Sequence, residues 1–212
     1  TTDALDAHNR AKSKFEVIEG VEVHRVPNLN NWLAWRRLFM PLAYGGQLEH
    51  GLRQVDVVHL HEYRSFQNAV ALPKIQRLNV PFVLSAQGGL PRLMGRYALK
   101  QVYDAFVGWR LIRRACRLHA LNSMERDQFA QLGGRPEQIV VAPNGINIDE
   151  YRTLPAAVAQ TFRNKYNIPT DAPLVLFLAR LNKIKGVDFL VSAFAQARRE
   201  LPQFERRANG KH

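Results

Sequence analysis

Short β-branched runs alternate with longer amphipathic runs along this chain. Alternating or continuous apolar runs predict strands, and apolar residues spaced three and four positions apart predict helices. The predicted strands cover residues 55–61, 80–85, 117–121, 138–142 and 174–178, and residues 17–26 are predicted to form a strand or a hairpin broken at Gly20. The predicted helices cover residues 64–78, 96–115, 123–131 and 187–200, and residues 32–52 are predicted helical on either side of a break at Pro41 and Gly45-Gly46. Asn122 followed by Glu125 predicts a capping box at the start of the helix over 123–131.

The order of these elements indicates the fold class. Strands that are apolar on both faces and alternate with helices indicate a parallel α/β sheet that is covered on both sides. Between residues 143 and 173 the pattern loosens and three prolines interrupt it. This shift in composition predicts a boundary, so the fold class is α/β in two parts.

The composition is that of a folded chain. The 212 residues are 46% hydrophobic and 23% charged, which suffices for one large domain or two small ones. All apolar runs are much shorter than the roughly 18 to 20 residues that span a bilayer. The single cysteine, Cys116, excludes an internal disulfide framework and a cysteine-rich metal site, and it fits a reducing cytosol.

The charge balance points to anionic partners. The net charge is +12, from 30 Lys and Arg against 18 Asp and Glu. Cations concentrate between residues 92 and 117, where Asp104 is the one acidic residue. This run could be a binding surface or a solvated helix face. Zinc-finger spacing, a basic tail and an RNA-binding aromatic signature are all missing from the sequence, so we expect no nucleic-acid partner.

Ligands of parallel sheets bind beyond the carboxyl ends of the strands. After the predicted strand at 174–178 come Arg180, Lys185 and Gly186, and the glycine opens a helix. Arginine offers a bidentate fork to phosphate oxygens, lysine adds a mobile charge, and a helix N-terminus adds N–H donors. These residues could hold a diphosphate and stabilise it as it departs. Alternatively, Arg180 and Lys185 are solvated loop cations.

Other polar segments follow the remaining predicted strands. Gln87-Gly88-Gly89 and Asn144-Gly145 are typical of tight turns, and both could also lie beside a ligand. His61-Glu62 could form an acid/base pair or half of a metal site. His59 alternates with His61 on the same strand, so both could face the crevice, although core or capping roles are favoured. No third ligand follows at a recognisable spacing, and the sequence has no Asp-x-Asp, so we expect no metal.

Four segments in this order resemble the family 4 retaining glycosyltransferases. They are VDVVHLH at 55–61, SAQGGLP at 85–91, VVAPNGIN at 140–147, and FLARL at 177–181 with KGVDFL at 185–190. The resemblance implies the GT-B architecture, in which two Rossmann-like domains face each other across a cleft. By this resemblance, residues 1–153 form an acceptor-side domain that lacks its first strand. Residues 154–212 become the start of a nucleotide-sugar-binding domain, whose final stretch, 203–212, leaves the pattern.

The same resemblance implies roles for the polar segments. Arg180 and Lys185 bind the donor diphosphate together with Gly186, and they stabilise the leaving group. The loop Gln87-Gly88-Gly89 and the pair His61-Glu62 line the acceptor side of the cleft, with a glutamine where many relatives carry histidine. Asn144-Gly145 is the interdomain hinge.

The implied reaction transfers a sugar, with retention, from a nucleotide-sugar donor to a glycan or lipid-linked acceptor in polysaccharide or glycolipid biosynthesis. No metal or other cofactor is expected. Relatives approach membrane-bound acceptors with the first domain. We therefore expect the cationic run Arg96–Arg117 to contact an anionic membrane, with the protein in the cytoplasm at the inner face of the plasma membrane.

The family pattern extends beyond both ends of this sequence, with a first strand upstream and a pair of glutamates downstream. We therefore expect the isolated 212-residue chain to be an inactive fragment that folds poorly. The alternative is a non-catalytic basic α/β module that binds an anionic surface or nucleic acid. Such a module requires the run Arg96–Arg117 and has no use for Arg180 and Lys185.

Overall fold

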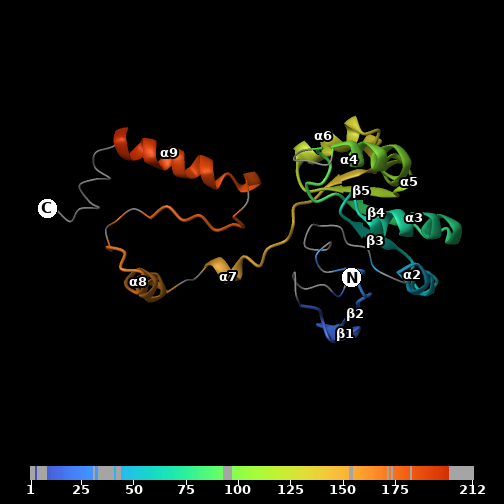
Figure 1. Cartoon of the computed structure of the whole chain (residues 1–212), viewed down its shortest axis with the longest axis horizontal. Coiled ribbons are helices and arrows are strands. Elements are labelled where there is room, and N and C mark those ends of the chain that lie inside the picture. Colours follow the sequence, from blue (N-terminus) through green and yellow to red (C-terminus); the bar gives the residue numbers. More distant parts are fainter. Residues whose placement is uncertain are drawn as a thin grey trace. The chain divides into compact units, whose positions relative to one another are not determined.

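In the computed structural model the chain forms two compact units, Thr1–Gly145 and Ile146–His212 (Figure 1). The structure describes residue 3 and residues 9–30, 32, 41, 44–92, 97–152, 155–170, 172, 174–181 and 183–200. Residues 153 and 154, which flank the predicted domain division, and the final stretch 203–212 lie outside these described ranges.

A four-stranded parallel sheet forms the centre of the first unit. In spatial order its strands are β3 (Val58–His61), β4 (Phe82–Ser85), β5 (Arg117–Ala120) and β6 (Ile139–Val141). Each strand falls inside one of the predicted runs, and every neighbouring pair is parallel. Parallel strands need crossover connections, which helices provide here. The α/β fold class is therefore confirmed.

Helices connect the strands of this unit. They are α2 (Tyr44–Leu52), α3 (Phe66–Leu78), α4 (Tyr97–Tyr103), α5 (Trp109–Arg114) and α6 (Ser123–Gln131). One π-helical turn, Asp104–Gly108, joins α4 to α5, so the helix predicted over 96–115 is interrupted in its middle. A 3₁₀ turn at Pro136–Gln138 precedes β6. The predicted run at 17–26 is a hairpin of β1 (Phe15–Ile18) and β2 (Val21–His24), which turns at Gly20.

Local signals define the limits of α3. The Ser65 side chain accepts a hydrogen bond from the Asn68 amide at 3.1 Å and so caps the first turn. The helix ends at Asn79, whose backbone is left-handed with φ of 52°. Asparagine tolerates this conformation better than most residues, so the sequence encodes both ends of the helix.

The hydrophobic core lies on one face of the sheet. Leu60, Leu84 and Leu118 are in register on three adjacent strands, and all three are buried. They belong to one cluster with Ile75 of α3 and Ile112 of α5. Because side chains alternate along a strand, the residues between these leucines point to the opposite face.

That opposite face is polar where the sequence suggested a second apolar layer. His61, Ser85 and His119 share a register row across β3, β4 and β5, and His59 lies opposite Val83. Ser85 is fully buried, whereas both histidines of β3 are exposed. The expectation of a sheet with apolar side chains packed on both sides is therefore wrong for the described residues.

The second unit contains α7 (Asp149–Arg152), α8 (Ala156–Lys165), a 3₁₀ turn at Lys183–Lys185 and α9 (Val187–Glu200). Helix α9 has the bounds predicted from the sequence. The strand predicted at 174–178 is not present, because no neighbouring strand pairs with this run among the described residues of the unit. A β-strand needs such a partner for its backbone N–H and C=O groups.

A buried glycine in the π-turn is predicted to control the stability of the first unit. A Cβ atom at Gly108 would overlap the Tyr63 hydroxyl oxygen and lie 2.8 Å from the ring atom Cζ. Tyr63 is itself buried, so its ring can give way only by shifting within the packed interior. We expect Gly108→Ala to lower the free energy of unfolding by about 1 to 3 kcal/mol, measured by urea denaturation.

Gly46→Ala is the matched control for this substitution. Gly46 also lies in a helix, but a Cβ atom there would meet nothing within 4 Å. The better helix propensity of alanine should make this variant neutral or more stable by up to about 1 kcal/mol. Equal effects of the two substitutions would contradict the packing of Tyr63 against Gly108.

Candidate functional site

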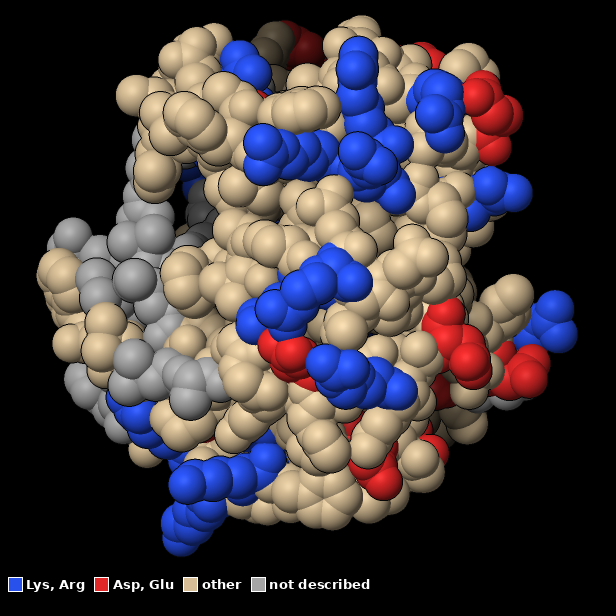
Figure 2. Space-filling view, turned by 90° about the vertical axis from the view of Figure 1, so that its right-hand side faces the viewer, with Lys and Arg blue, Asp and Glu red and all other residues tan. Residues whose placement is uncertain are grey.

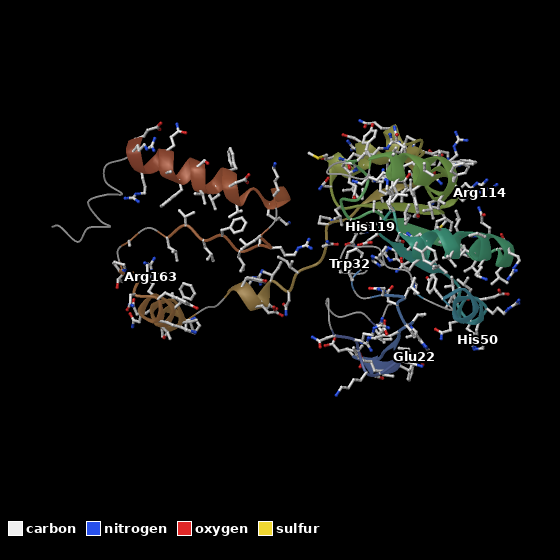
Figure 3. The ribbon with its side chains drawn as sticks, in the orientation of Figure 1. Glu22, Trp32, His50, Arg114, His119 and Arg163 are labelled. Atoms are coloured by element: carbon white, nitrogen blue, oxygen red, sulfur yellow. The ribbon has the colours of Figure 1, made fainter. Side chains whose placement is uncertain are left out.

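The carboxyl ends of β3, β4 and β5 meet at one edge of the sheet. His61 ends β3 and Ser85 ends β4. His119 lies next to the end of β5 (Figure 3). The loop Gln87-Gly88-Gly89 follows directly after β4. The topology therefore brings together the polar residues of three chain segments, at the place where parallel sheets bind ligands.

The conformation of the loop after β4 depends on its glycines. Gln87 and Gly88 both have positive φ, at 51° and 76°. A Cβ atom at Gly89 would lie 2.8 Å from the Ala86 carbonyl oxygen, so a larger residue would force the backbone to shift. The Gly89 amide donates to that same oxygen at 2.9 Å. The loop is thus a tight turn, as its residues suggested, and it lies at the sheet edge.

One guanidinium group holds this loop in place. Arg64 donates from Nη1 to the Gly89 carbonyl at 2.6 Å and from Nη2 to the Leu90 carbonyl at 2.9 Å. Its Nε and Nη2 atoms also donate to the two carboxylate oxygens of Asp104, each at 2.8 Å. Arg64 therefore ties the loop to the π-turn that contains Asp104.

Asp104 is the centre of a buried ionic cluster. Its carboxylate also accepts from Arg92 Nε at 2.9 Å, and its side chain is 9% exposed. Burial opposes its ionisation, but the hydrogen bonds from Arg64 and Arg92 outweigh burial and lower the pKa of the carboxyl group. Asp104 is therefore ionised but neutralised internally, and it does not offset the exposed cations of the surrounding helix.

A second carboxylate fixes the loop from the other side. Glu125 accepts hydrogen bonds from the Gly88 amide and from the Leu121 amide, each at 2.7 Å, and it is buried. Asn122 accepts from the Glu125 amide at 2.9 Å, as the predicted N-cap requires. The second half of the predicted capping box is wrong, because the Glu125 side chain bonds Gly88 and Leu121 and not the Asn122 amide.

Histidines and a buried serine form a hydrogen-bonded chain across the polar face of the sheet. Ser85 Oγ lies 2.6 Å from His59 Nε2 and 2.6 Å from His119 Nδ1. His119 Nε2 lies 2.7 Å from the Ala142 carbonyl oxygen, beyond the end of β6. The ring centroids of His59 and His61 are 4.2 Å apart. Burial, followed by the neighbouring His61 and His119, lowers the pKa of His59.

The predicted acceptor-side residues come together only in part. Gln87 Nε2 lies 3.1 Å from His61 Nδ1, so the loop and the end of β3 are in direct contact. Glu62 has a left-handed backbone with φ of 64°, and its carbonyl accepts from Asn68 Nδ2 at 2.5 Å. Its carboxylate is exposed and forms no hydrogen bond with His61.

The described residues show neither a metal cluster nor a membrane span. They contain no group of three or more His, Cys, Asp or Glu side chains that could hold a metal ion. Among the helices that the structure describes, none combines the length and the apolar character needed to cross a bilayer.

The predicted diphosphate-binding residues lie in the second unit. Arg180 and Lys185 are exposed, and neither has a carboxylate partner among the described residues. Lys185 ends the 3₁₀ turn, and Gly186 follows with φ of 66°, its amide donating to the Lys183 carbonyl at 3.1 Å. Helix α9 begins at the next residue. The expected sequence of loop, glycine and helix start is therefore present.

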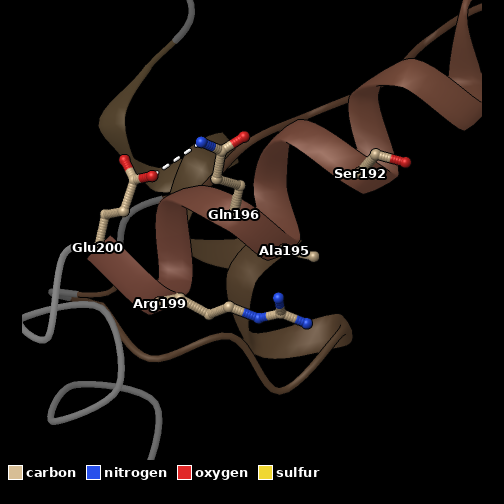
Figure 4. A pocket seen from close by; sticks show the side chains of 5 residues that line it. All are labelled: Ser192, Ala195, Gln196, Arg199 and Glu200. Atoms are coloured by element: carbon tan, nitrogen blue, oxygen red, sulfur yellow. Dashed lines mark hydrogen bonds between the residues drawn. The ribbon is translucent and has the colours of Figure 1, made fainter.

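Asn144 and Gly145, predicted as the interdomain hinge, lie exposed at the end of the first unit. Ala142, just before them, is anchored by a 2.9 Å bond from its amide to the Ala120 carbonyl. A shallow hollow runs along α9 and is lined by Ser192, Ala195, Gln196, Arg199 and Glu200 (Figure 4). Gln196 donates to Glu200 there at 2.7 Å. One helix provides all of its lining, so we assign no site to it.

Sequence patterns missed several of these residues. Arg64, Asp104, Ser85 and His119 were not singled out as candidates for a site. A usable signal did exist for the histidines, because His59, His61 and His119 each occupy a polar position in an otherwise apolar strand. No local pattern reveals the Arg64–Asp104 pair, whose members are 40 residues apart.

Comparisons with known proteins agree with this fold. Residues 4–145 match the family model described as a glycosyl transferase 4-like domain. The D-inositol 3-phosphate glycosyltransferase of Kineococcus radiotolerans is 30% identical over 169 residues, which are 74% of this chain and 36% of that protein. The enzyme of the same name from Frankia alni is 28% identical over 194 residues, which are 85% of this chain and 44% of that protein.

A solved structure shows the same architecture. The Anabaena protein Alr3699/HepE, in complex with UDP-glucose, superposes with a TM-score of 0.62 at 21% sequence identity. The alignment covers 84% of this chain and 44% of that protein. At this level of identity the likeness establishes the fold. The chain spans less than half the length of each of these three proteins.

The two bonds to Glu125 yield a testable prediction. Glu125→Gln replaces one accepting oxygen with an NH₂ group that faces a backbone N–H, so one buried donor loses its partner. We expect the free energy of unfolding to fall by about 1 to 3 kcal/mol. Hydrogen exchange measured by NMR should also become faster at the Gly88 and Leu121 amides.

Glu137→Gln is the control, because it removes the same charge from an exposed side chain paired only with Arg135. We expect an effect within about 0.5 kcal/mol there. If the Gly88 amide exchanged at its normal rate in Glu125→Gln, Glu125 would not be holding the loop.

Proposed function

We propose that this chain, which belongs to the glycosyl transferase 4-like family, is part of a glycosyltransferase that moves a sugar from a nucleotide-sugar donor to an acceptor hydroxyl. The family match over residues 4–145 carries this proposal. The names of the two aligned relatives, and the UDP-glucose in the superposed structure, support the same reaction class. The activity is proposed for the whole protein, because the chain spans less than half of those relatives.

The donor diphosphate is proposed to bind at Arg180 and Lys185. Both side chains are exposed and free of carboxylate partners among the described residues, so their charges are available to an anion. Gly186 directly precedes α9. The N–H groups at the start of this helix and its dipole favour phosphate oxygens. The two cations would stabilise the diphosphate as it leaves, which is electrostatic catalysis without a metal ion. Transfer with retention is proposed by analogy with the family.

The acceptor is proposed to bind at the sheet edge of the first unit, along His61, Glu62 and the loop Gln87-Gly88-Gly89. Gln87 is neutral, so it can bond a sugar hydroxyl but cannot exchange a proton with it. Arg64 and Glu125 hold the loop before any ligand arrives, and a preorganised site loses less entropy on binding. Asn144-Gly145 is proposed as the hinge between this unit and the next.

A glycan or lipid-linked acceptor at a cytoplasmic membrane surface is proposed from the basic surface. This surface consists of the exposed cations Arg110, Arg113, Arg114 and Arg117. Arg96, which belongs to the predicted run, lies outside the described residues. Lys and Arg side chains gather over the upper and middle part of the face in Figure 2.

Exposed apolar side chains accompany these cations. Leu99, Val102, Phe106 and Trp109 are 44 to 70% exposed on α4, the π-turn and α5. The guanidinium groups of Arg110 and Arg113 lie 5.4 Å and 6.0 Å from the Trp109 ring centroid. Aromatic and apolar side chains bordered by cations favour the interface of an anionic bilayer.

The donor site makes a first prediction. In the 212-residue chain, Arg180→Ala and Lys185→Ala should each weaken the binding of UDP or GDP, measured by calorimetry, by roughly tenfold or more. Arg198→Ala, which removes an exposed cation from the last turn of α9, should leave binding unchanged. Equal losses in all three variants would point to unspecific charge attraction. We expect the isolated chain to transfer no sugar.

The basic surface makes a second prediction. Reversal of Arg110, Arg113 and Arg114 to Glu should weaken binding to phosphatidylglycerol-containing vesicles by roughly 100-fold, because each well-placed cation contributes about 1 kcal/mol. Reversal of Arg126, Arg152 and Arg198 changes the net charge equally and should have little effect. Unchanged vesicle binding in the first variant would exclude this surface as the membrane contact.

A further inference from the structure

The chain of hydrogen bonds through His59, Ser85 and His119 has a defined direction. The Ala142 carbonyl oxygen can only accept, so His119 Nε2, 2.7 Å away, must carry a proton. In a neutral His119 ring the other nitrogen, Nδ1, is then a bare acceptor. Ser85 must therefore donate its hydroxyl proton to His119 Nδ1.

The same reasoning assigns the proton of the His59 ring. Because the Ser85 proton is directed at His119, Ser85 Oγ accepts from its second neighbour, and His59 Nε2 must be the donor. A neutral His59 with its proton on Nε2 has a lone pair on Nδ1. That nitrogen has no hydrogen-bond partner among the described residues, and His59 is exposed.

The neighbouring His61 ring offers a hydrogen-bond donor where His59 offers an acceptor. The Gln87 amide nitrogen lies 3.1 Å from His61 Nδ1, so this nitrogen accepts and the proton of a neutral His61 is on Nε2. The two ring centroids are 4.2 Å apart. Two neighbouring imidazoles thus offer one acceptor and one donor, and a hydroxyl group uses both functions when it binds.

We propose that His59 is a binding residue for a hydroxyl group of the acceptor, and that Ser85 and His119 are positioning residues that keep its Nδ1 atom in the accepting state. The ligand class is a polyhydroxyl compound such as a sugar or a cyclitol. This inference rests on the proposed glycosyltransferase function, and it adds three residues that the sequence did not assign to the acceptor site.

The direction of the hydrogen bonds through His59, Ser85 and His119 reverses when this group of residues gains one proton from solvent. If His119 Nδ1 takes the proton, it donates to Ser85 Oγ, and the Ser85 hydroxyl proton turns toward His59 Nε2. His59 then carries its own proton on Nδ1, which becomes a donor and no longer accepts from a ligand hydroxyl. The bond from His119 to Ala142 is the same in both states.

The charged form of His59 is disfavoured at neutral pH, first by burial and then by the two neighbouring histidines. Among the described residues, the titratable groups that bear on His59 are His61 on its own strand and His119 on β5, together with the burial of its inner edge. All three lower the pKa of His59. A neutral His59 ring is therefore favoured at physiological pH, and its Nδ1 atom stops accepting only as the pH falls.

Histidine tautomers in the 212-residue chain test this directly, by long-range ¹H–¹⁵N NMR of ¹⁵N-labelled protein. At about pH 7.5 we expect His59 and His119 to carry their protons on Nε2. As the pH is lowered, His59 should change tautomer in the same transition in which His119 becomes charged. A proton on His59 Nδ1 at about pH 7.5, or independent titration of the two rings, would overturn the proposal.

Three variants test whether the hydrogen bonds through Ser85 couple the two histidines, or whether the side chains are merely packed together. Ser85→Ala should break the link, so that His59 titrates independently and loses its tautomer preference. In His119→Gln the amide can still donate to Ala142 and accept from Ser85, but it cannot take up a proton. His59 should then keep its Nε2 proton without the change of tautomer. His50→Gln, on exposed α2, is the control and should alter neither.

Ligand binding completes the test, with myo-inositol as the probe. We expect its addition to shift the His59 Nδ1 resonance at neutral pH, with affinity falling roughly tenfold in Ser85→Ala and below the tautomer transition. No shift at His59 would overturn its assignment to the acceptor site. Nucleotide binding through Arg180 and Lys185 is measured separately, so a failure here is distinguishable from failure of the proposed function.

Discussion

The Arg64 guanidinium group is the constraint on which the first unit depends. It joins the segment after β3, the loop after β4 and the π-turn between α4 and α5, through two carbonyls and one carboxylate. A buried arginine needs such a complete set of acceptors, since an unpaired charge in the interior is strongly destabilising. The π-turn helps to provide it by placing Asp104 toward Arg64, while Gly108 leaves space for the Tyr63 ring. The shape of the loop at the sheet edge is thus determined by packing within the unit, before any ligand binds.

The two faces of the sheet serve different purposes. On one face, the register of Leu60, Leu84 and Leu118 builds the core against α3 and α5. On the other, the same alternation places a buried serine between two imidazoles, where its hydroxyl group needs both a donor and an acceptor. The carbonyl of Ala142 satisfies the end of this chain and thereby gives it a direction. A purely apolar second face would lack this linked set of hydrogen-bond donors and acceptors.

The cations of the chain fall into two groups with different availability. Arg64 and Arg92 are committed to Asp104, so they contribute to stability and not to ligand binding. Arg180 and Lys185 have no carboxylate partner among the described residues, and this suits them to an anionic ligand. The net charge of +12 therefore describes a mixture of internal ion pairs and free surface charge. Distinguishing the two requires the partners of each side chain, which a count of charges does not provide.

The sequence alone determined the elements of the parallel sheet, the N-cap of α6, the bounds of α9, and the resemblance that led to the family. These features are encoded locally, by periodicity over neighbouring residues and by short motifs. The prediction of a strand at 174–178 was wrong because a strand is not encoded locally: it forms only when a neighbouring strand pairs with it. The Arg64–Asp104 pair, the second partner of Glu125 and the histidine chain were decided only by the tertiary structure. Each joins residues that are 23 to 40 positions apart, and their proximity in space depends on how strands and loops pack.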